Sequence, residues 1–480
     1  MPVTTIFMPA MAQWQHGGQR GAALTLLVLL TGVALAATAV AAETLVEDRS
    51  PVAFGLCMGW LVLGLLAAWA APHAERRAIT ALALVAASFA WRFLSIHFVT
   101  GVDLGADPMN YQNLAHAVLD GRGLITDDWR YGRDLRAYFP PLYPLLLAGW
   151  WRIFGEAPAT TLAMTTLIDA ASAWMIADTG RRLGQKTAGW LAAMLFFSYP
   201  PFALSAAIPQ KEALTILLVT AMVRSTAIWL GDADGWARLR HGIMLGGAWG
   251  LLALTQPGVA LLPAAVALGL ATLRGWRATL WLGIMAVPAL VLVMLPWWVR
   301  NWLVFGTFVP FTTASGFMTN VALGAHGAPI PESIFALPEP QRSTIIGGEA
   351  VRRIGERPLS FILETGRALL AGFAYEEATL ARYRHTTPPI STAARAMLTG
   401  PLQLAYVSVI AAAALRCWQQ LRIGRISPLV PIGLAMILGI GAINMWFEFG
   451  ERHRYALAPI LFLLAAGALL EARRRTPPAA

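Results

Sequence analysis

The sequence is poor in charge and in lysine. Only 13% of its 480 residues are charged, about half the share that is usual in soluble domains, so an ordinary soluble protein is excluded. Lys186 and Lys211 are its two lysines, and the net charge of +10 therefore comes from arginine. The arginines stand in short clusters between apolar runs, a pattern typical of membrane topology and not of a nucleic-acid partner.

Cysteine is equally scarce. Cys57 and Cys417 lie far apart in or beside apolar segments, without the CxxC spacing or the neighbouring histidines of a metal or redox motif. A disulfide framework and a zinc site are therefore not expected, and both residues are interpreted as small buried hydrophobes.

Long apolar runs are what the sequence has in abundance. Hydrophobic residues make up 57% of the chain, its mean hydropathy is +0.59, and a helix needs about 20 apolar residues to cross a bilayer. The fold class predicted is an all-α polytopic membrane protein with 12–13 transmembrane segments and interfacial helices in its extracytoplasmic loops. The thirteen candidate spans are residues 21–42, 52–71, 79–99, 141–154, 160–177, 188–208, 213–230, 242–254, 258–273, 278–297, 401–415, 428–447 and 456–470.

Charge predicts which loops face the cytoplasm. Arginine clusters near residues 76, 181, 238, 274, 416–425 and 473 are all cytoplasmic only if residues 141–177 make one net crossing. The short segment 141–154 is then re-entrant; the alternative is that one cluster violates the rule. Polar residues gather on the opposite, extracytoplasmic side, in segments 101–140, 209–212, 301–400 and 448–455.

The first of these outer segments carries the strongest local pattern. After Pro108, Tyr111, Leu114 and Val118 recur at helical spacing, which predicts an amphipathic helix lying in the membrane interface. Asp107 is expected at its N-cap, where a carboxylate accepts backbone N–H bonds. A purely structural cap and a catalytic carboxylate both remain open for this residue.

The order of motifs resembles a known family. An acid four residues before a tyrosine, an interfacial helix, a glycine turn and PPLYPLLLAGWWRIFG are similar to GT-C glycosyltransferases, in particular the protein O-mannosyltransferase and lipid A aminoarabinose transferase group, glycosyltransferase family 39 and its relatives. The stretches PWWVRNWLVFG and RHRYALAP fit as well. The resemblance covers roughly residues 91–470 of one domain, 1–480, and leaves residues 1–78 as an extra N-terminal helical hairpin.

The resemblance implies transfer of a sugar from a polyprenyl-phosphate donor to a hydroxyl of an extracytoplasmic acceptor. Asp107 matches the catalytic aspartate, and a carboxylate can take the proton of the attacking hydroxyl. Two positions depart from the family pattern: Pro108 stands where glutamate is usual, and Pro140 where some members have lysine. The cation for the donor phosphate must come from elsewhere.

The remaining candidates follow from position at the outer face. Candidates for binding the donor phosphate are Arg300, Arg452, Arg454 and Lys211, each of which could instead be a snorkelling interfacial side chain. Candidates for positioning the acceptor or substrate are Glu212, Tyr111, His116, Tyr138 and Tyr455. An amphipathic helix over 348–373 is expected to cover the site or to bind lipid. Asp169, in the middle of a span, is expected to face the bundle interior.

No metal ligand and no cofactor is predicted, because the histidines show no ligand spacing, although a divalent cation stays open since some GT-C members use one. The expected partners are the lipid-linked donor, the acceptor and membrane lipids, in a multi-pass protein of the cytoplasmic (inner) membrane with its active site on the periplasmic side. The alternative function is a transporter or flippase for lipid-linked or small substrates. Transporters place polar sites near the bilayer midplane, whereas here they concentrate in outer loops.

Overall fold

The computed structural model describes residues 4–48, 51–99, 106–128, 130–231, 235–324, 327–376, 392–447 and 450–474. Parts of three predicted outer segments lie outside the described residues: 101–105, 377–391 and 448–449. The interpretation of residues 1–78 as an extra hairpin, added to the part that resembles the family, remains a prediction.

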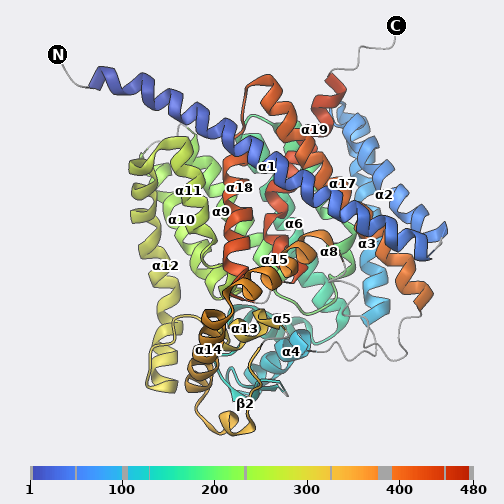
Figure 1. The fold of residues 1–480 in the computed structure, drawn as a ribbon. Coiled ribbons are helices and arrows are strands. Elements are labelled where there is room, and N and C mark those ends of the chain that lie inside the picture. Colours follow the sequence, from blue (N-terminus) through green and yellow to red (C-terminus); the bar gives the residue numbers. More distant parts are fainter. Residues whose placement is uncertain are drawn as a thin grey trace.

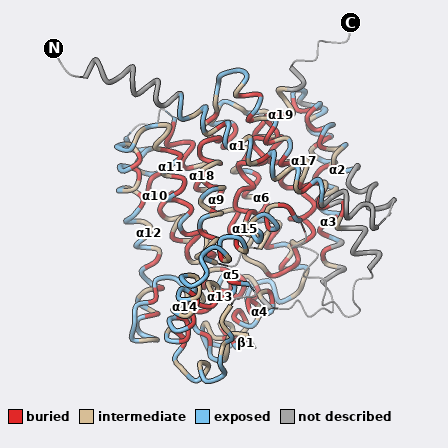
Figure 2. The backbone as a smooth tube through the Cα atoms, viewed as in Figure 1, coloured by how far each residue is buried: buried red, intermediate tan, exposed pale blue. Residues whose placement is uncertain are grey.

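A bundle of long helices makes up most of the molecule (Figure 1). Its helices are α1 (Thr4–Asp48), α2 (Pro51–Ala70), α3 (Ala74–Val99), α6 (Pro158–Arg182), α7 (Lys186–Phe197), α8 (Pro200–Leu204), α9 (Glu212–Leu230), α10 (Gly235–Ala253), α11 (Leu262–Arg274), α12 (Trp276–Phe305), α17 (Thr392–Ile423), α18 (Leu429–Asn444) and α19 (Ala458–Arg474), with 3-10 turns η1 (Pro257–Val259) and η5 (Glu451–Leu457). Burial is greatest along the central helices, whereas α12 is largely exposed on the outside of the bundle (Figure 2).

Each of the thirteen predicted spans overlaps at least one helix. Within the described residues, six helices are long and apolar enough to cross a membrane, as judged by length and composition. The six are Gly17–Ala39, Lys186–Leu204, Glu212–Leu230, Pro257–Arg274, Trp276–Phe305 and Glu451–Glu471. The span predicted over 188–208 is interrupted between α7 and α8, because Pro200 and Pro201 cannot donate the backbone hydrogen bonds that a continuous helix needs.

Arginine–tryptophan contacts occur near helix ends, and two of them lie in segments that the charge pattern assigns to the cytoplasm. Arg76 lies 4.3 Å from the ring of Trp69, and Arg422 lies 4.8 Å from the ring of Trp418. Both rings are more than 40% exposed, as expected for tryptophan at the level of lipid headgroups.

A second group of elements lies together at the opposite end of the bundle (Figure 1). Its members are α4 (Ala106–Leu119), β1 (Thr126–Asp128), β2 (Gly132–Leu135), α5 (Leu142–Phe154), α13 (Ser315–Ala322), η3 (Glu332–Ala336), α14 (Glu339–Glu356) and α15 (Pro358–Ala374). Helix α5 has 13 residues, about 20 Å of helix, and packs against α4. It is too short to cross the hydrocarbon core, which fits the re-entrant alternative for 141–154.

The all-α fold class is confirmed, with a small antiparallel hairpin, β1 and β2, added to the helices. One sequence-based expectation about these elements was wrong. The helix expected over 348–373 is two helices, α14 and α15, which divide at Arg357. The residue before a proline is driven away from the helical region, and Arg357 has φ −137° and ψ 57° ahead of Pro358.

The buried carboxylate of Glu339 links the segments predicted as outer loops, 101–140 and 301–400, through hydrogen bonds. Glu339 accepts hydrogen bonds from the backbone N–H of Arg136 (2.7 Å) and of Ala137 (3.1 Å) and from the hydroxyl of Thr313. Its exposed fraction is 6%, and a buried donor that loses its acceptor costs about 1–3 kcal/mol. Glu339 therefore fixes the segment before α5 against α14.

We expect Glu339→Ala to loosen this junction without unfolding the bundle, because three donors lose one shared acceptor. Amide hydrogen exchange at Arg136 and Ala137 should accelerate at least tenfold. Glu356→Ala, which removes an exposed carboxylate of the same helix paired with Arg352, is the matched control and should leave both amides unchanged. Equal protection in Glu339→Ala and the wild type would contradict this role.

Candidate functional site

Helix α4 places Asp107 at the outer end of the bundle. The helix begins at Ala106, so Asp107 lies in its first turn and not at the predicted N-cap. A carboxylate in the first turn is still favoured by the helix dipole. The expected apolar face is present: Tyr111 and Leu114 are buried, and the Tyr111 ring packs edge-on against that of Tyr143 of α5 at 5.2 Å.

The carboxylate of Asp107 lies between two arginines. Its Oδ2 accepts a hydrogen bond from Arg452 Nη2 at 2.7 Å, and its Oδ1 lies 3.9 Å from Arg130 Nη2. The Asp107 side chain is 18% exposed, so it is reachable from outside. Arg452 is separated from Asp107 by 345 residues in sequence, and the fold alone brings them together.

Arg452 also faces a second predicted site residue. Its Nη1 lies 3.6 Å from Oε1 of Glu212, at the start of α9. The neighbouring Lys211 donates a hydrogen bond to the Tyr111 hydroxyl at 3.0 Å. The structure therefore brings Asp107, Arg452 and Glu212 together into one cluster. The Lys211–Tyr111 pair lies beside this cluster, because Lys211 directly precedes Glu212 in the sequence.

Arg130, a residue that the sequence did not single out, lies next to Asp107 as well. Arg130 binds Asp128 through Nε (3.1 Å) and Nη2 (2.9 Å), and Asn110 of α4 donates to the same carboxylate at 2.5 Å. Burial by itself would raise the pKa of Asp128, but the hydrogen bonds from Arg130 and Asn110 lower it below its ordinary value. The ionised Asp128 holds the Arg130 guanidinium next to Asp107.

Arg454 lies away from this cluster. It is 2% exposed, forms an ion pair with Glu376 and stacks 4.0 Å from the ring of Tyr406. Tyr455 donates a hydrogen bond to the same Glu376 at 2.5 Å. Arg454 is therefore occupied inside the bundle, contrary to the expectation of an outward-facing phosphate ligand, and together with Tyr455 it fixes the chain just after Arg452 to Glu376. The sequence gave no signal for this pairing.

Two further candidates, Arg300 and His116, are not brought to Asp107, whereas Tyr138 lies near enough to Asp107 and Arg130 to interact with them electrostatically. Arg300 of α12 donates to Asn301 Oδ1 (2.9 Å) and to the Leu124 carbonyl (3.4 Å). His116, at the far end of α4, pairs with Glu156 at 2.7 Å. The Tyr138 ring is stacked on Tyr131 with centroids 4.4 Å apart, inside a small apolar cluster of the outer elements.

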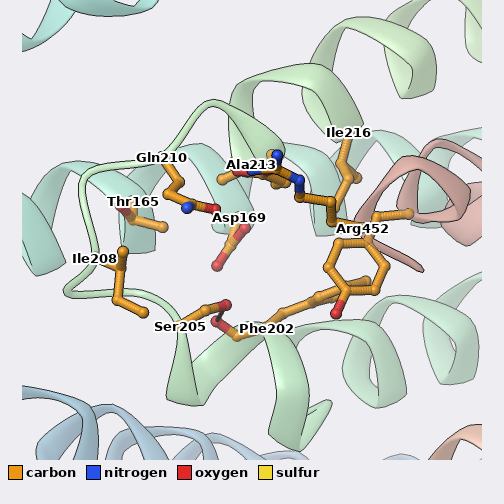
Figure 3. Close-up of a pocket in the computed structure, with 11 residues that line it drawn as sticks. Thr165, Asp169, Phe202, Ser205, Ile208, Gln210, Ala213, Ile216 and Arg452 are labelled. Atoms are coloured by element: carbon orange, nitrogen blue, oxygen red, sulfur yellow. Dashed lines mark hydrogen bonds and ion pairs between the residues drawn. The ribbon is translucent and has the colours of Figure 1, made fainter. Parts of the chain in front are cut away.

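A cavity extends from the cluster into the bundle (Figure 3). It is lined by Thr165, Asp169, Phe202, Ser205, Ile208, Gln210, Glu212, Ala213, Ile216, Arg452 and Tyr455. Its volume is about 40 Å³, and one water needs roughly 10–15 Å³, so it holds a few waters and must widen to admit a sugar. Polar side chains of α6 and α9 thus face a space that reaches Arg452.

The inner wall of this cavity carries a buried ion pair. Arg92 of α3 donates to Asp169 of α6 at 2.8 Å, and their side chains are 1% and 3% exposed. As expected from its position in the span, Asp169 faces the interior. Among the described residues, Nη1 of Arg92 has no hydrogen-bond partner, so this pair is incompletely satisfied.

No group of three or more histidine, cysteine, aspartate or glutamate side chains suited to a metal ion occurs within the part of the chain that the structure describes. Two carboxylates, Asp107 and Glu212, flank Arg452. The Arg452 guanidinium lies between them and offsets one of their two negative charges.

No protein-family model matches the chain, and no curated protein matches it. Among solved structures, it is similar to the Archaeoglobus fulgidus oligosaccharyltransferase tethered with an acceptor peptide, with 13% identity over 80% of this chain and 49% of that chain, and a TM-score of 0.46. It is also similar to ArnT from Cupriavidus metallidurans bound to undecaprenyl phosphate, with 15% identity over 82% of this chain and 78% of that one, and a TM-score of 0.41.

The chain spans about half the length of the archaeal oligosaccharyltransferase. At these identities and TM-scores the similarity says nothing of donor, acceptor or residue roles.

Proposed function

We propose that this protein is a membrane glycosyltransferase of the GT-C kind, which moves a sugar from a polyprenyl-phosphate donor to a hydroxyl of an extracytoplasmic acceptor. The observation that carries the proposal is the contact of Asp107 with Arg452 at 2.7 Å, beside a cavity that Arg452 and Glu212 line. A carboxylate suited to accept a proton and a guanidinium suited to bind a phosphate lie side by side. The proposed setting is the cytoplasmic (inner) membrane, with the site on its outer side.

The chemistry assigns one task to each group. The acceptor oxygen attacks the anomeric carbon of the donor, and its proton passes to a carboxylate oxygen of Asp107. The bond between that carbon and the phosphate oxygen breaks, and its electron pair leaves with the polyprenyl phosphate. Arg452 stabilises the anionic leaving group, because a charge-assisted hydrogen bond strengthens as charge develops on the oxygen. No cofactor enters these steps.

Donor binding is proposed to release the base. A carboxylate held by two arginines is a weak base, because the positive charges favour its ionised form. A lipid phosphate that binds Arg452 competes with Asp107 for the same guanidinium and leaves the carboxylate free for the acceptor hydroxyl. Arg130 remains next to Asp107 in this step, because two of its nitrogen atoms donate hydrogen bonds to Asp128.

Mass spectrometry of envelope lipids, glycans and proteins from a deletion strain tests the function and identifies both substrates. We expect one class of acceptor to lack a single sugar and the sugar-loaded polyprenyl phosphate to accumulate. Complementation with the wild-type gene should restore both. An unchanged envelope together with an unchanged pool of lipid-linked sugars would exclude the proposal.

A transporter or flippase is the second candidate, and the buried pair of Arg92 and Asp169 on the cavity wall favours it. Ionisable side chains inside a membrane are costly and often mark a transport path. Two sets of proteoliposomes, one without and one with lipid-linked sugar, distinguish the two candidates. Uptake of a polar solute in the set without lipid-linked sugar would support transport. Glycosyl transfer in the set with lipid-linked sugar, and no uptake in either set, would exclude it.

A further inference from the structure

Away from the Asp107 cluster, three arginines surround one carboxylate. Asp178, near the end of α6, accepts hydrogen bonds from Arg181 Nε at 3.0 Å and from Arg182 Nε at 2.7 Å. Arg224 of α9 donates to the same carboxylate at 2.7 Å. Arg224 lies twelve residues after Glu212 on α9, about 18 Å along the helix. This group, which we call the Asp178 cluster, is therefore separate from the proposed active site.

The Asp178 cluster has more positive charge than its one carboxylate can balance. Among the described residues, no other carboxylate forms an ion pair with Arg181, Arg182 or Arg224. Each guanidinium has five N–H groups in a planar fork, and a single carboxylate cannot accept from all of them. The surplus of two positive charges and several donors suits an anion.

A buried histidine next to the Asp178 cluster also favours an anion site. His241 of α10 is 3% exposed, and its Nε2 lies 3.5 Å from Arg240 Nη2. Within the described ranges its Nδ1 has no hydrogen-bond partner. Arg224 and Arg182 are near enough to act electrostatically on the ring. An unpaired ring nitrogen beside a surplus of guanidinium groups is unusual in a closed protein interior.

The surroundings indicate that the anion belongs to a lipid. Trp174 lies one helical turn before Asp178 and is 60% exposed. The guanidinium of Arg224 lies 5.2 Å from the Trp174 ring. Tryptophan is enriched at the level of lipid headgroups in membrane proteins, so the exposed Trp174 indicates that the Asp178 cluster lies beside the headgroups.

We infer that the Asp178 cluster binds the phosphodiester of an anionic phospholipid in the leaflet opposite the Asp107 cluster. Arg182 and Arg224 donate to the phosphate oxygens, and the glycerol and upper acyl chain lie against Trp174. A headgroup with one net negative charge offsets half of the surplus, whereas a zwitterionic headgroup offsets none of it. This site does not depend on the proposed glycosyl transfer.

Native mass spectrometry of the full-length protein tests this inference. The purified protein is titrated separately with phosphatidylglycerol, phosphatidylethanolamine and inorganic phosphate. We expect one phosphatidylglycerol to bind saturably at concentrations where phosphatidylethanolamine does not. Arg224→Gln should weaken this binding about fivefold, the effect expected for one arginine at an anionic lipid. Arg182→Gln gives the same measurement if Arg224→Gln cannot be purified, since each leaves Asp178 with two partners.

Arg422→Gln is the matched control. Arg422 also lies over an exposed tryptophan, Trp418, at 4.8 Å, but it is outside the Asp178 cluster. Its substitution should leave phosphatidylglycerol binding unchanged. Equal weakening in Arg422→Gln and Arg224→Gln would reduce the effect to diffuse positive charge and overturn the inference. Equal affinity for phosphatidylethanolamine, or tighter binding of inorganic phosphate than of lipid, would overturn it as well.

Discussion

Replacing Asp107 with asparagine is expected to lower the rate of glycosyl transfer by about 10²–10⁴-fold, the usual contribution of a general base. Asparagine keeps the size of the side chain and can still accept a hydrogen bond from Arg452, but it cannot take the acceptor proton. The polyprenyl phosphate should still bind, because Arg452 remains. The measurement is the release of polyprenyl phosphate from the lipid-linked donor in proteoliposomes, followed over time by mass spectrometry.

Asp120→Asn provides the control for this experiment. Asp120 follows the end of α4, is exposed and pairs with Arg122, so its substitution makes the same chemical change near the same helix. It should transfer at the wild-type rate. Wild-type transfer by a folded Asp107→Asn variant would show that another group takes the proton.

Replacing Asp169 with leucine is expected to destabilise the protein by about 3–5 kcal/mol, because Arg92 would keep its charge in the bundle interior without a partner. The pair has 1% and 3% exposure, so solvent cannot compensate the loss. Thermal unfolding in detergent, followed by the exposure of buried tryptophan, measures the effect, and the midpoint should fall by several degrees.

A double variant separates stability from function at this pair. Arg92→Met combined with Asp169→Leu removes both charges and fills similar volume, so the stability lost in the single variant should return. If the pair is structural, transfer should return with it. Restored stability without restored transfer would instead assign the pair a part in substrate handling, and a double variant as unstable as the single one would contradict the ion-pair explanation.

The sequence predicts the helices well because each is encoded locally. An apolar run near 20 residues specifies a span whatever its neighbours are, and each of the thirteen predicted runs overlaps at least one helix. Breaks inside helices were harder to predict. Pro200 and Pro201 divide one predicted span, and Pro358 divides the predicted helix over 348–373. Proline is tolerated in membrane helices such as α12, which contains Pro288 and Pro296, so proline alone does not decide where a helix ends.

The candidate site was predicted only in part, because its contacts join distant segments. The sequence singled out Asp107, Glu212 and Arg452 one by one, but nothing in it specified that Arg452 would bridge the two carboxylates. The interior position of Arg454 was missed because Arg452 and Arg454 look alike in sequence, and only the fold turns one toward Asp107 and the other toward Glu376. The hairpin that carries Asp128 was missed because it has only two short strands of three and four residues.

The account's central claim is that Arg452 exchanges Asp107 for the phosphate of a lipid carrier. A structure of the wild-type protein with polyprenyl phosphate measures this directly. We predict that a phosphate oxygen lies within hydrogen-bonding distance of Arg452 and that the 2.7 Å contact between Arg452 and Asp107 is broken, with the carboxylate facing the open side. A phosphate bound elsewhere, with the Asp107–Arg452 contact intact, would contradict the claim.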